Sequence, residues 1–180
     1  MKIPHTTFFI LITFITAKAQ SNLQKCYVSE IGFTFNVPAD YKVSYHKNQD
    51  GYTSENPILE IKKSDSATQA RIDITVSLLK VTDANTKLFD NMIPYIKQSI
   101  LLVSADNMAP KLDTLFTKVK IDKQIADKIS VADNNNSLKT STSSYLGKSS
   151  GYYFNIGIFT NNIKWRNEIF ALIEAGSFNN

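Results

Sequence analysis

One stretch near the start of the chain, from Ile31 to Val43, alternates hydrophobic and polar side chains with a period of two. Its hydrophobic positions are Phe33, Phe35 and Val37. This alternation is typical of a β-strand that buries one face. Pro38 predicts the end of the strand, because proline has no N–H to donate to a sheet. A short turn then predicts that a second strand, at 41–45, pairs with the first.

The same alternation recurs along most of the chain. Further strands are predicted at 58–62, 71–80, 115–121, 125–131 and 152–160, with a weaker one near 139–146. The strand at 71–80 is the longest, and its hydrophobic positions from Ile72 to Leu78 face away from Asp73 and Thr75. A sheet with one polar face is typically antiparallel. We therefore expect an antiparallel sheet.

A long helix is predicted from Asn85 to about Val103, where hydrophobic residues recur at intervals of three and four. Asp83 is its predicted N-cap. Pro94 lies inside this pattern and removes one helical hydrogen bond, which predicts a kink or a break.

A second helix is predicted from Lys164 to about Ala175, with Gly176 as its stop. Its hydrophobic face consists of Trp165, Ile169, Leu172 and Ile173. Phe178 is expected to return to the same core. Trp165 fits the core pattern, and the alternative for this residue is an exposed binding anchor.

Residues 1–19 have the organisation of a secretory signal peptide. Lys2 gives a basic start, a nine-residue hydrophobic run from Phe8 to Thr16 follows, and Ala17-Lys-Ala19 matches a cleavage signal. A buried N-terminal helix is the alternative. The run is too short to span a bilayer. We expect cleavage between Ala19 and Gln20, no transmembrane segment in the mature chain, and a secreted or periplasmic protein.

The mature chain is expected to form a flexible lead at 20–26 followed by one domain at 27–180. Without Lys2 and Lys18 it has 18 basic and 16 acidic residues, a net charge of +2. Such a balanced chain does not favour nucleic-acid binding. Cys26 is the one cysteine and cannot form an intramolecular disulfide, so it is either a free thiol or an intermolecular bridge. The pattern favours a tolerated thiol in the flexible lead.

The motifs of known catalytic sites are incomplete in this chain. Gly147-Lys-Ser-Ser-Gly151 matches the nucleophile elbow of α/β-hydrolases, but no histidine follows Ser149 and a strand replaces the required helix. We interpret it as an exposed β-turn. A Cys26–His46 thiol pair is disfavoured because Cys26 lies in the lead.

Metal and cofactor motifs are incomplete as well. One cysteine and one mature histidine are too few for a zinc site, and 133–137 lacks the glycine and closing glutamate of a calcium loop. We therefore expect no catalytic, cofactor-binding or metal-binding residues. Asp65-Ser-Ala67 and Asp113-Thr-Leu115 match a short O-glycosylation signal of some exported bacterial proteins, and the sequence does not decide whether either is used.

The opening Gly-Phe-x-Phe-x-Val-Pro-x-x-Tyr-x-Val at 32–43 resembles the start of PsbP-like domains, relatives of an extrinsic photosystem II subunit. The hairpin at 121–129 and the closing Ser-Phe at 177–178 extend the resemblance, although Lys123 replaces the usual turn glycine. The resemblance implies an α+β fold in which helices sandwich an antiparallel sheet (α/β/α). It implies no catalytic residues, and family members are mostly accessory or binding proteins.

These observations lead to a hypothesis of function. We expect an exported, non-enzymatic accessory or binding domain of the cell envelope or extracellular space, with a protein or envelope component as its partner. Two alternatives remain open, a small-ligand carrier with a pocket between helix and sheet, and a small secreted hydrolase.

Overall fold

The computed structural model describes residues 22–46, 57–105, 112–133 and 139–179. In these residues the strands are β1 Leu23–Val28, β2 Phe33–Pro38, β3 Lys42–Tyr45, β4 Leu59–Asp65, β5 Ala70–Lys80, β6 Leu112–Ile121, β7 Gln124–Asp133, β8 Ser141–Ser149, β9 Tyr152–Thr160 and β10 Ser177–Phe178. The helices are α1 Asp83–Ala105 and α2 Ile163–Glu174, and a 3₁₀ turn spans Ser29–Ile31.

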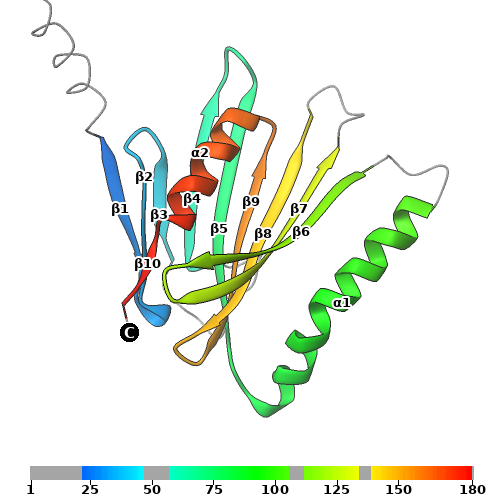
Figure 1. Ribbon diagram of the computed structural model, residues 1–180. Coiled ribbons are helices and arrows are strands. Elements are labelled where there is room, and N and C mark those ends of the chain that lie inside the picture. The colour runs from blue at the N-terminus through cyan, green and yellow to red at the C-terminus, as the bar shows by residue number, and fades with distance from the viewer. Residues whose placement is uncertain (1–21, 47–56, 106–111, 134–138, 180) are drawn as a thin grey trace, which may run out of the picture.

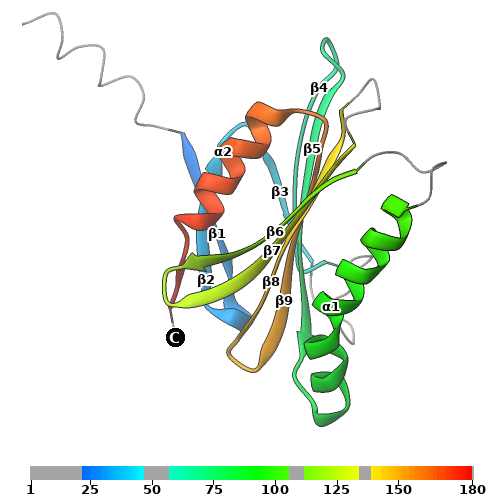
Figure 2. The same ribbon diagram turned by 45° about the vertical axis from the view of Figure 1, so that its right-hand side comes forward.

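The strands form two antiparallel sheets (Figure 1). The larger has seven strands in the order β3-β4-β5-β9-β8-β7-β6, and the smaller has three in the order β1-β2-β10. The small sheet and α2 lie on one side of the large sheet, and α1 lies on the other (Figure 2). The predicted α+β architecture, an antiparallel sheet between helices, is therefore confirmed.

The hydrophobic core lies between the large sheet, α2 and the small sheet. Its sheet wall is built from cross-strand neighbours such as Val76 opposite Ile156, both fully buried. Phe178 stacks on Phe33 with ring centroids 4.6 Å apart, as expected for a returning C-terminus. Gly147 is required here, since a Cβ would lie 2.4 Å from the ring of Phe154.

The predicted pairing of the first two strands is wrong. Strand β2 pairs with β1 and β10, whereas β3 pairs with β4 in the other sheet. The turn between them closes through a hydrogen bond from Tyr41 N to Pro38 O at 3.1 Å. It redirects the chain from one sheet to the other instead of folding it back as a hairpin.

The expected flexible lead is also wrong from Leu23 onward, because these residues form β1. Cys26 lies opposite Phe35 in the ladder and is 0% exposed. The side chains at 23–28 alternate only weakly in hydrophobicity, and the strand is held by its partner β2 more than by its own pattern. The predicted signal peptide and cleavage point at 1–20 lie outside the described residues.

The first helix begins earlier than predicted and does not break. Thr82 rather than Asp83 caps it, since Thr82 Oγ1 accepts from Asn85 N while Asn85 Oδ1 accepts from Thr82 N at 2.8 Å. The helix continues through Pro94, because proline removes only one donor from the ladder. No helix among the described residues is long and hydrophobic enough to cross a membrane.

The second helix agrees with its prediction. Asn162 caps its start, with Oδ1 accepting from Trp165 N at 3.1 Å. Ile169 and Ile173 are fully buried, and Gly176 follows the end of the helix. The glycine is needed because a Cβ would lie 2.6 Å from the ring of Phe33.

Candidate ligand-binding cleft

The two faces of the large sheet differ in chemistry. The alternation along β5 that buries Ile74 and Val76 toward α2 places Thr75 and Ser77 on the opposite face. In the ladder, Ser77 lies opposite Asn155 of β9. The face toward α1 is therefore rich in hydroxyl and amide groups, which do not make a hydrophobic core.

Helix α1 packs on this polar face through a few large side chains. The ring of Phe89 stacks on Tyr153 of β9, with centroids 3.8 Å apart and an interplanar angle of 17°. Leu88 and Tyr95, by contrast, are each 70% exposed. The helix thus covers the polar face only in part.

A cleft of about 240 Å³ lies between α1 and the sheet. The residues that line the cleft come from one helix and three strands. They are Met92 and Ile96 from α1, Ile129 and Val131 from β7, Thr142, Ser143, Ser144 and Leu146 from β8, and Asn155 from β9. A smaller hollow of about 100 Å³ shares Ile129 with it and extends along β6 and β7. The wall formed by α1 is thus hydrophobic, and the wall formed by the sheet combines hydrophobic side chains with hydrogen-bonding groups.

Asn155 is the polar side chain that characterises this cleft. Its Oδ1 is buried and has no hydrogen-bond partner among the described residues. Buried polar atoms are nearly always paired, and leaving one unpaired costs roughly 1–3 kcal/mol. A ligand hydroxyl or N–H placed in the cleft would supply the missing donor.

A partly buried ion pair lies on the α2 side of the large sheet. Lys128 Nζ lies 2.7 Å from Glu174 Oε1, and Tyr145 Oη donates to the same oxygen at 2.7 Å. Burial raises the pKa of Tyr145, and the adjacent Glu174 raises it further. Burial also acts to raise the pKa of Glu174, but the hydrogen bonds from Lys128 and Tyr145 outweigh it and hold that pKa low. These contacts tie α2 to β7 and β8.

The structure does not bring the sequence-predicted reactive residues together. Ser149 is not an exposed turn residue, as predicted, but the last residue of β8, 3% exposed, with Oγ donating to Ile31 O at 3.2 Å. The turn is formed by Ser150 and Gly151, whose φ angles are 49° and 78°. A serine buried in this way has no room for a substrate, which disfavours the hydrolase alternative.

Cys26 and His46 differ in environment, and they belong to strands of different sheets or their ends. Burial raises the pKa of Cys26 to about 11, although a hydrogen bond with Tyr45 lowers it in part, so the thiol stays protonated at neutral pH. His46 follows β3, is half exposed, and has Nε2 3.5 Å from Glu60 Oε2. The described residues contain no cluster of three metal-ligating side chains.

The two glycosylation-like tripeptides occupy different environments. Ser66 is exposed in the turn between β4 and β5, where Asp65 Oδ1 accepts from Ala67 N at 2.9 Å. Thr114 lies within β6, and its Oγ1 is buried. Only the first tripeptide presents its hydroxyl residue on an exposed turn.

Sequence reasoning missed the cleft because its polar residues lie in a segment of low complexity. The run Thr-Ser-Ser at 142–144 falls within the weaker strand predicted near 139–146, and it lies in the first half of β8. The alternation along this run shows which side chains face the cleft only once β8 is paired with β9, where Leu146 lies opposite Asn155.

The fold of this chain resembles that of a solved PsbP structure. The chain is similar to the solution structure of cyanobacterial PsbP (CyanoP) from Synechocystis sp. PCC 6803, with 9% identity, a TM-score of 0.54, and coverage of 88% of this chain and 93% of the other. The resemblance predicted from the opening motif is confirmed at the level of the fold. No protein-family model and no curated protein sequence matches the chain.

Two further solved structures are similar. A protein of Bacteroides thetaiotaomicron has 12% identity and a TM-score of 0.52 over 89% of this chain, which spans about half (50%) of that protein's length. LpqN, described as involved in cell envelope biogenesis of Mycobacterium tuberculosis, has 12% identity and a TM-score of 0.47, with 94% and 97% of the two chains covered. At these identities the likeness concerns the fold alone.

Proposed function

We propose that this chain is an exported, non-enzymatic binding domain that holds a small ligand in the cleft between α1 and the large sheet. The observation that carries the proposal is the buried, unpartnered Oδ1 of Asn155 beside a cleft of about 240 Å³. A binding domain fits the mixed hydrophobic and hydroxyl lining, because such a lining orients a ligand without supplying a nucleophile and base.

The lining defines the class of ligand. Met92, Ile96 and Leu146 favour a hydrophobic body, and Asn155 favours a hydrogen-bond donor at one end. At roughly 30 Å³ per water, the volume corresponds to about eight water molecules, which suits a small amphipathic molecule. The ligand would contact α1 and β7–β9 together.

Export rests on the arrangement of residues 1–19, with the basic start, hydrophobic run and Ala-x-Ala signal in the order that secretion requires. In this proposal the processed chain acts outside the cytoplasm, as an accessory to a protein or envelope component. N-terminal sequencing of the exported protein tests this part. Processing between Ala19 and Gln20 supports it, and a retained Met1 refutes it.

The cleft itself is tested with a hydrophobic fluorescent probe, 1-anilinonaphthalene-8-sulfonate, titrated into the folded mature chain. Ser144→Leu fills the cleft and is expected to weaken saturable binding by at least about tenfold, equivalent to about 1.4 kcal/mol. Ser44→Leu is the matched control, since Ser44 lies on β3 outside the lining. Equal affinity in the two variants, each with a native unfolding transition, would refute the cleft.

A further inference from the structure

A second, chemically different cleft lies at the other end of the large sheet. It has a volume of about 540 Å³. It is lined by Asp40, Lys42, Lys62, Lys63, Ser64, Arg71 and Asp73. In the ladders Lys42 lies opposite Lys62, which lies opposite Asp73, so the lining crosses β3, β4 and β5. Strand β3 is an edge strand, which leaves the cleft open on one side.

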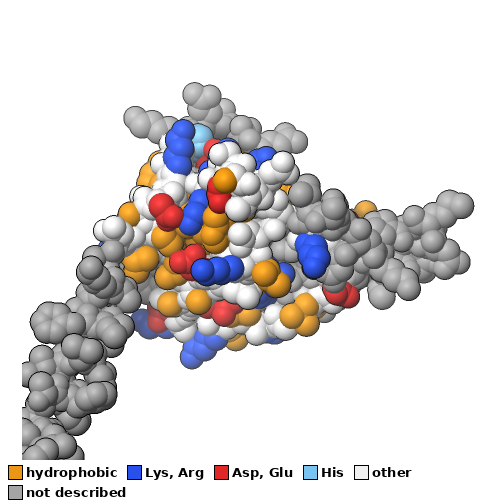
Figure 3. Space-filling model, turned by 90° about the horizontal axis from the view of Figure 1, so that it is seen from above, with side chains coloured by type: hydrophobic (Ala, Val, Ile, Leu, Met, Phe, Trp, Pro, Cys, Tyr) orange, Lys and Arg blue, Asp and Glu red, His pale blue; other side chains and the backbone are white. Residues whose placement is uncertain are grey.

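The lining concentrates positive charge. It contains four cationic side chains and two carboxylates, whereas the whole chain has 20 basic and 16 acidic residues. Seen from the end that carries the β4–β5 hairpin, basic and acidic side chains lie close together beside hydrophobic ones (Figure 3). The cleft thus attracts anions while keeping acidic groups within it.

Three of the cations are held by carboxylates that use one oxygen each. Lys63 Nζ lies 2.6 Å from Asp40 Oδ2, and Arg71 Nε pairs with Asp73 Oδ2. Lys62 Nζ lies 3.1 Å from Glu60. The second oxygens of Asp40 and Asp73, and the terminal nitrogens of Arg71, have no partner within the described part of the chain. They are available to a ligand.

The lysine that remains, Lys42, has no ion-pair or hydrogen-bond partner among the described residues and is exposed. Lys63 differs, since it is 19% exposed and its ammonium lies 4.8 Å from the ring centroid of Tyr41 and 4.5 Å from that of Trp165. The Lys63 ammonium is therefore held in place, whereas Lys42 is free to pair with a ligand.

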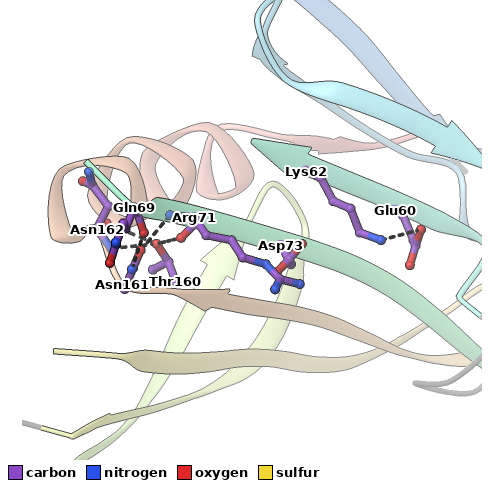
Figure 4. Close-up of polar contacts among 8 residues, drawn as sticks. All are labelled: Glu60, Lys62, Gln69, Arg71, Asp73, Thr160, Asn161 and Asn162. Carbon is purple, nitrogen blue, oxygen red and sulfur yellow. Dashed lines mark hydrogen bonds and ion pairs between the residues drawn. The ribbon is translucent and has the colours of Figure 1, made fainter. Parts of the chain in front are cut away.

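The backbone under Arg71 is also fixed (Figure 4). Arg71 N donates to Asn161 Oδ1 at 2.7 Å, and Thr160 Oγ1 donates to Arg71 O at 2.7 Å. Asn161 Nδ2 donates to Gln69 O at 2.8 Å. These bonds join residues about ninety positions apart, and they hold the β4–β5 hairpin to the turn before α2. The guanidinium therefore projects from a preorganised strand.

We propose that this cleft binds an acidic saccharide, a chain of sugar units that carry carboxylate or sulfate groups beside free hydroxyls. Arg71 and Lys42 would pair with the acidic groups, and the free oxygens of Asp40 and Asp73 would accept hydrogen bonds from sugar hydroxyls. A densely charged polyphosphate would be repelled by the two carboxylates. The open edge at β3 lets a longer saccharide continue past the cleft. This site is separate from the α1 cleft and does not depend on it.

The test is calorimetric titration of the folded mature chain with a galacturonic acid hexasaccharide, with maltohexaose as the neutral counterpart. We expect saturable binding of the acidic saccharide alone, weakening as salt is added. Arg71→Gln should weaken binding at least about tenfold, because charge-assisted hydrogen bonds are lost. Lys120→Gln is the matched control, an exposed lysine on the opposite edge strand β6, and should bind as the unchanged protein does.

A second variant separates saccharide recognition from simple attraction of anions. Asp73→Ala removes a negative charge, so an unspecific anion site would bind the hexasaccharide more tightly, whereas the proposal predicts weaker binding through loss of a hydroxyl acceptor. Tighter binding by Asp73→Ala, equal weakening by Lys120→Gln, or competition by equimolar inorganic phosphate would each overturn the proposal. Arg71 and Lys120 are surface residues, and a native unfolding transition is required of every variant.

Discussion

On the α2 side of the large sheet, Ile74, Val76 and Ile156 are fully buried in a continuous core, whereas on the α1 side Asn155 and Ser144 border an open cleft. The same strands build both faces, because successive side chains of a strand point to opposite sides. The comparison teaches that the α2 face carries the stability of the domain. That leaves the α1 face free to keep polar groups and incomplete packing, which a ligand site requires.

The largest expected effect comes from removing the α2 face. Deleting residues 163–180 removes α2 and β10 and exposes the core, including the contacts of Ile169, Ile173 and Phe178. Each fully buried large side chain contributes roughly 1.5–3 kcal/mol, and a domain of this size has only about 5–15 kcal/mol of net stability. We expect no cooperative thermal transition by circular dichroism. Removal of Asn180 alone is the control, and a folded truncated chain would contradict the comparison.

Breaking the partly buried ion pair between Lys128 and Glu174 should have the next largest effect. Glu174→Ala leaves Lys128, 12% exposed, without its carboxylate, and deprives Tyr145 of its acceptor. We expect a loss of about 2–3 kcal/mol in the free energy of unfolding, below the value for a fully buried pair, because Glu174 is a third exposed and solvent screens its charge. Glu174→Gln keeps an acceptor for Tyr145 and should cost less. Chemical denaturation measures both.

The same pair gives a pH dependence with a defined sign. The pKa of Glu174 is lower in the folded protein than in the unfolded chain, so its contribution is present above the ordinary glutamate pKa of about 4.3 and is lost as pH falls through the folded value. The stability difference between the unchanged protein and Glu174→Gln should therefore shrink below about pH 4. A difference that grows on acidification would contradict the assigned role.

Trp165 lies between the two predictions made for it, core residue and exposed anchor. It is half buried against the core, and the Lys63 ammonium lies over its ring. Trp165→Ala should lower the free energy of unfolding by about 2 kcal/mol, below the 3–5 kcal/mol typical of a fully buried aromatic residue. An unchanged thermal midpoint would show that Trp165 does not contribute to the core on the α2 side of the sheet.

The smallest effect is expected on the α1 face. Asn155→Leu removes a buried oxygen that has no partner, so we expect no loss of stability or a gain of up to about 1 kcal/mol. The matched change on the other face, Ile156→Asn, should be strongly destabilising because it buries an unpaired amide in the core. Thermal unfolding of the two variants compares neighbouring residues that point to opposite faces of one strand. Equal destabilisation by both variants would contradict the proposed difference between the two faces.

The elements that could be predicted are those whose hydrophobic pattern is carried by their own side chains. Strand β9 agrees residue for residue with its prediction, since its aromatic and β-branched residues carry the pattern themselves. Strand β1 was missed because Leu23–Val28 gains its order from β2. The Gly-x-Ser-x-Gly pattern placed Ser149 wrongly, because it suggested a turn that begins at Gly147, three residues too early.

The candidate sites were beyond the reach of sequence patterns for the same reason. Asn155 and Ser144 become a cleft only where α1 crosses their face, and Arg71 becomes a fixed cation only where Asn161 holds its backbone. Neither the crossing of α1 nor the hydrogen bond from Arg71 to Asn161 produces a hydrophobic pattern with the period of a helix or a strand.

By itself, the sequence determined the strands with strict alternation and the two helices, because each depends on the side chains of one continuous segment. The motifs at 32–43, 121–129 and 177–178 together indicated the PsbP-like fold. Tertiary structure alone decided that β2 and β3 belong to different sheets, that Cys26 and Ser149 are buried, and which face of the large sheet stays open. Those outcomes depend on contacts between distant segments, such as the hydrogen bonds that join Arg71 to Asn161, and a local pattern carries no record of its distant partner.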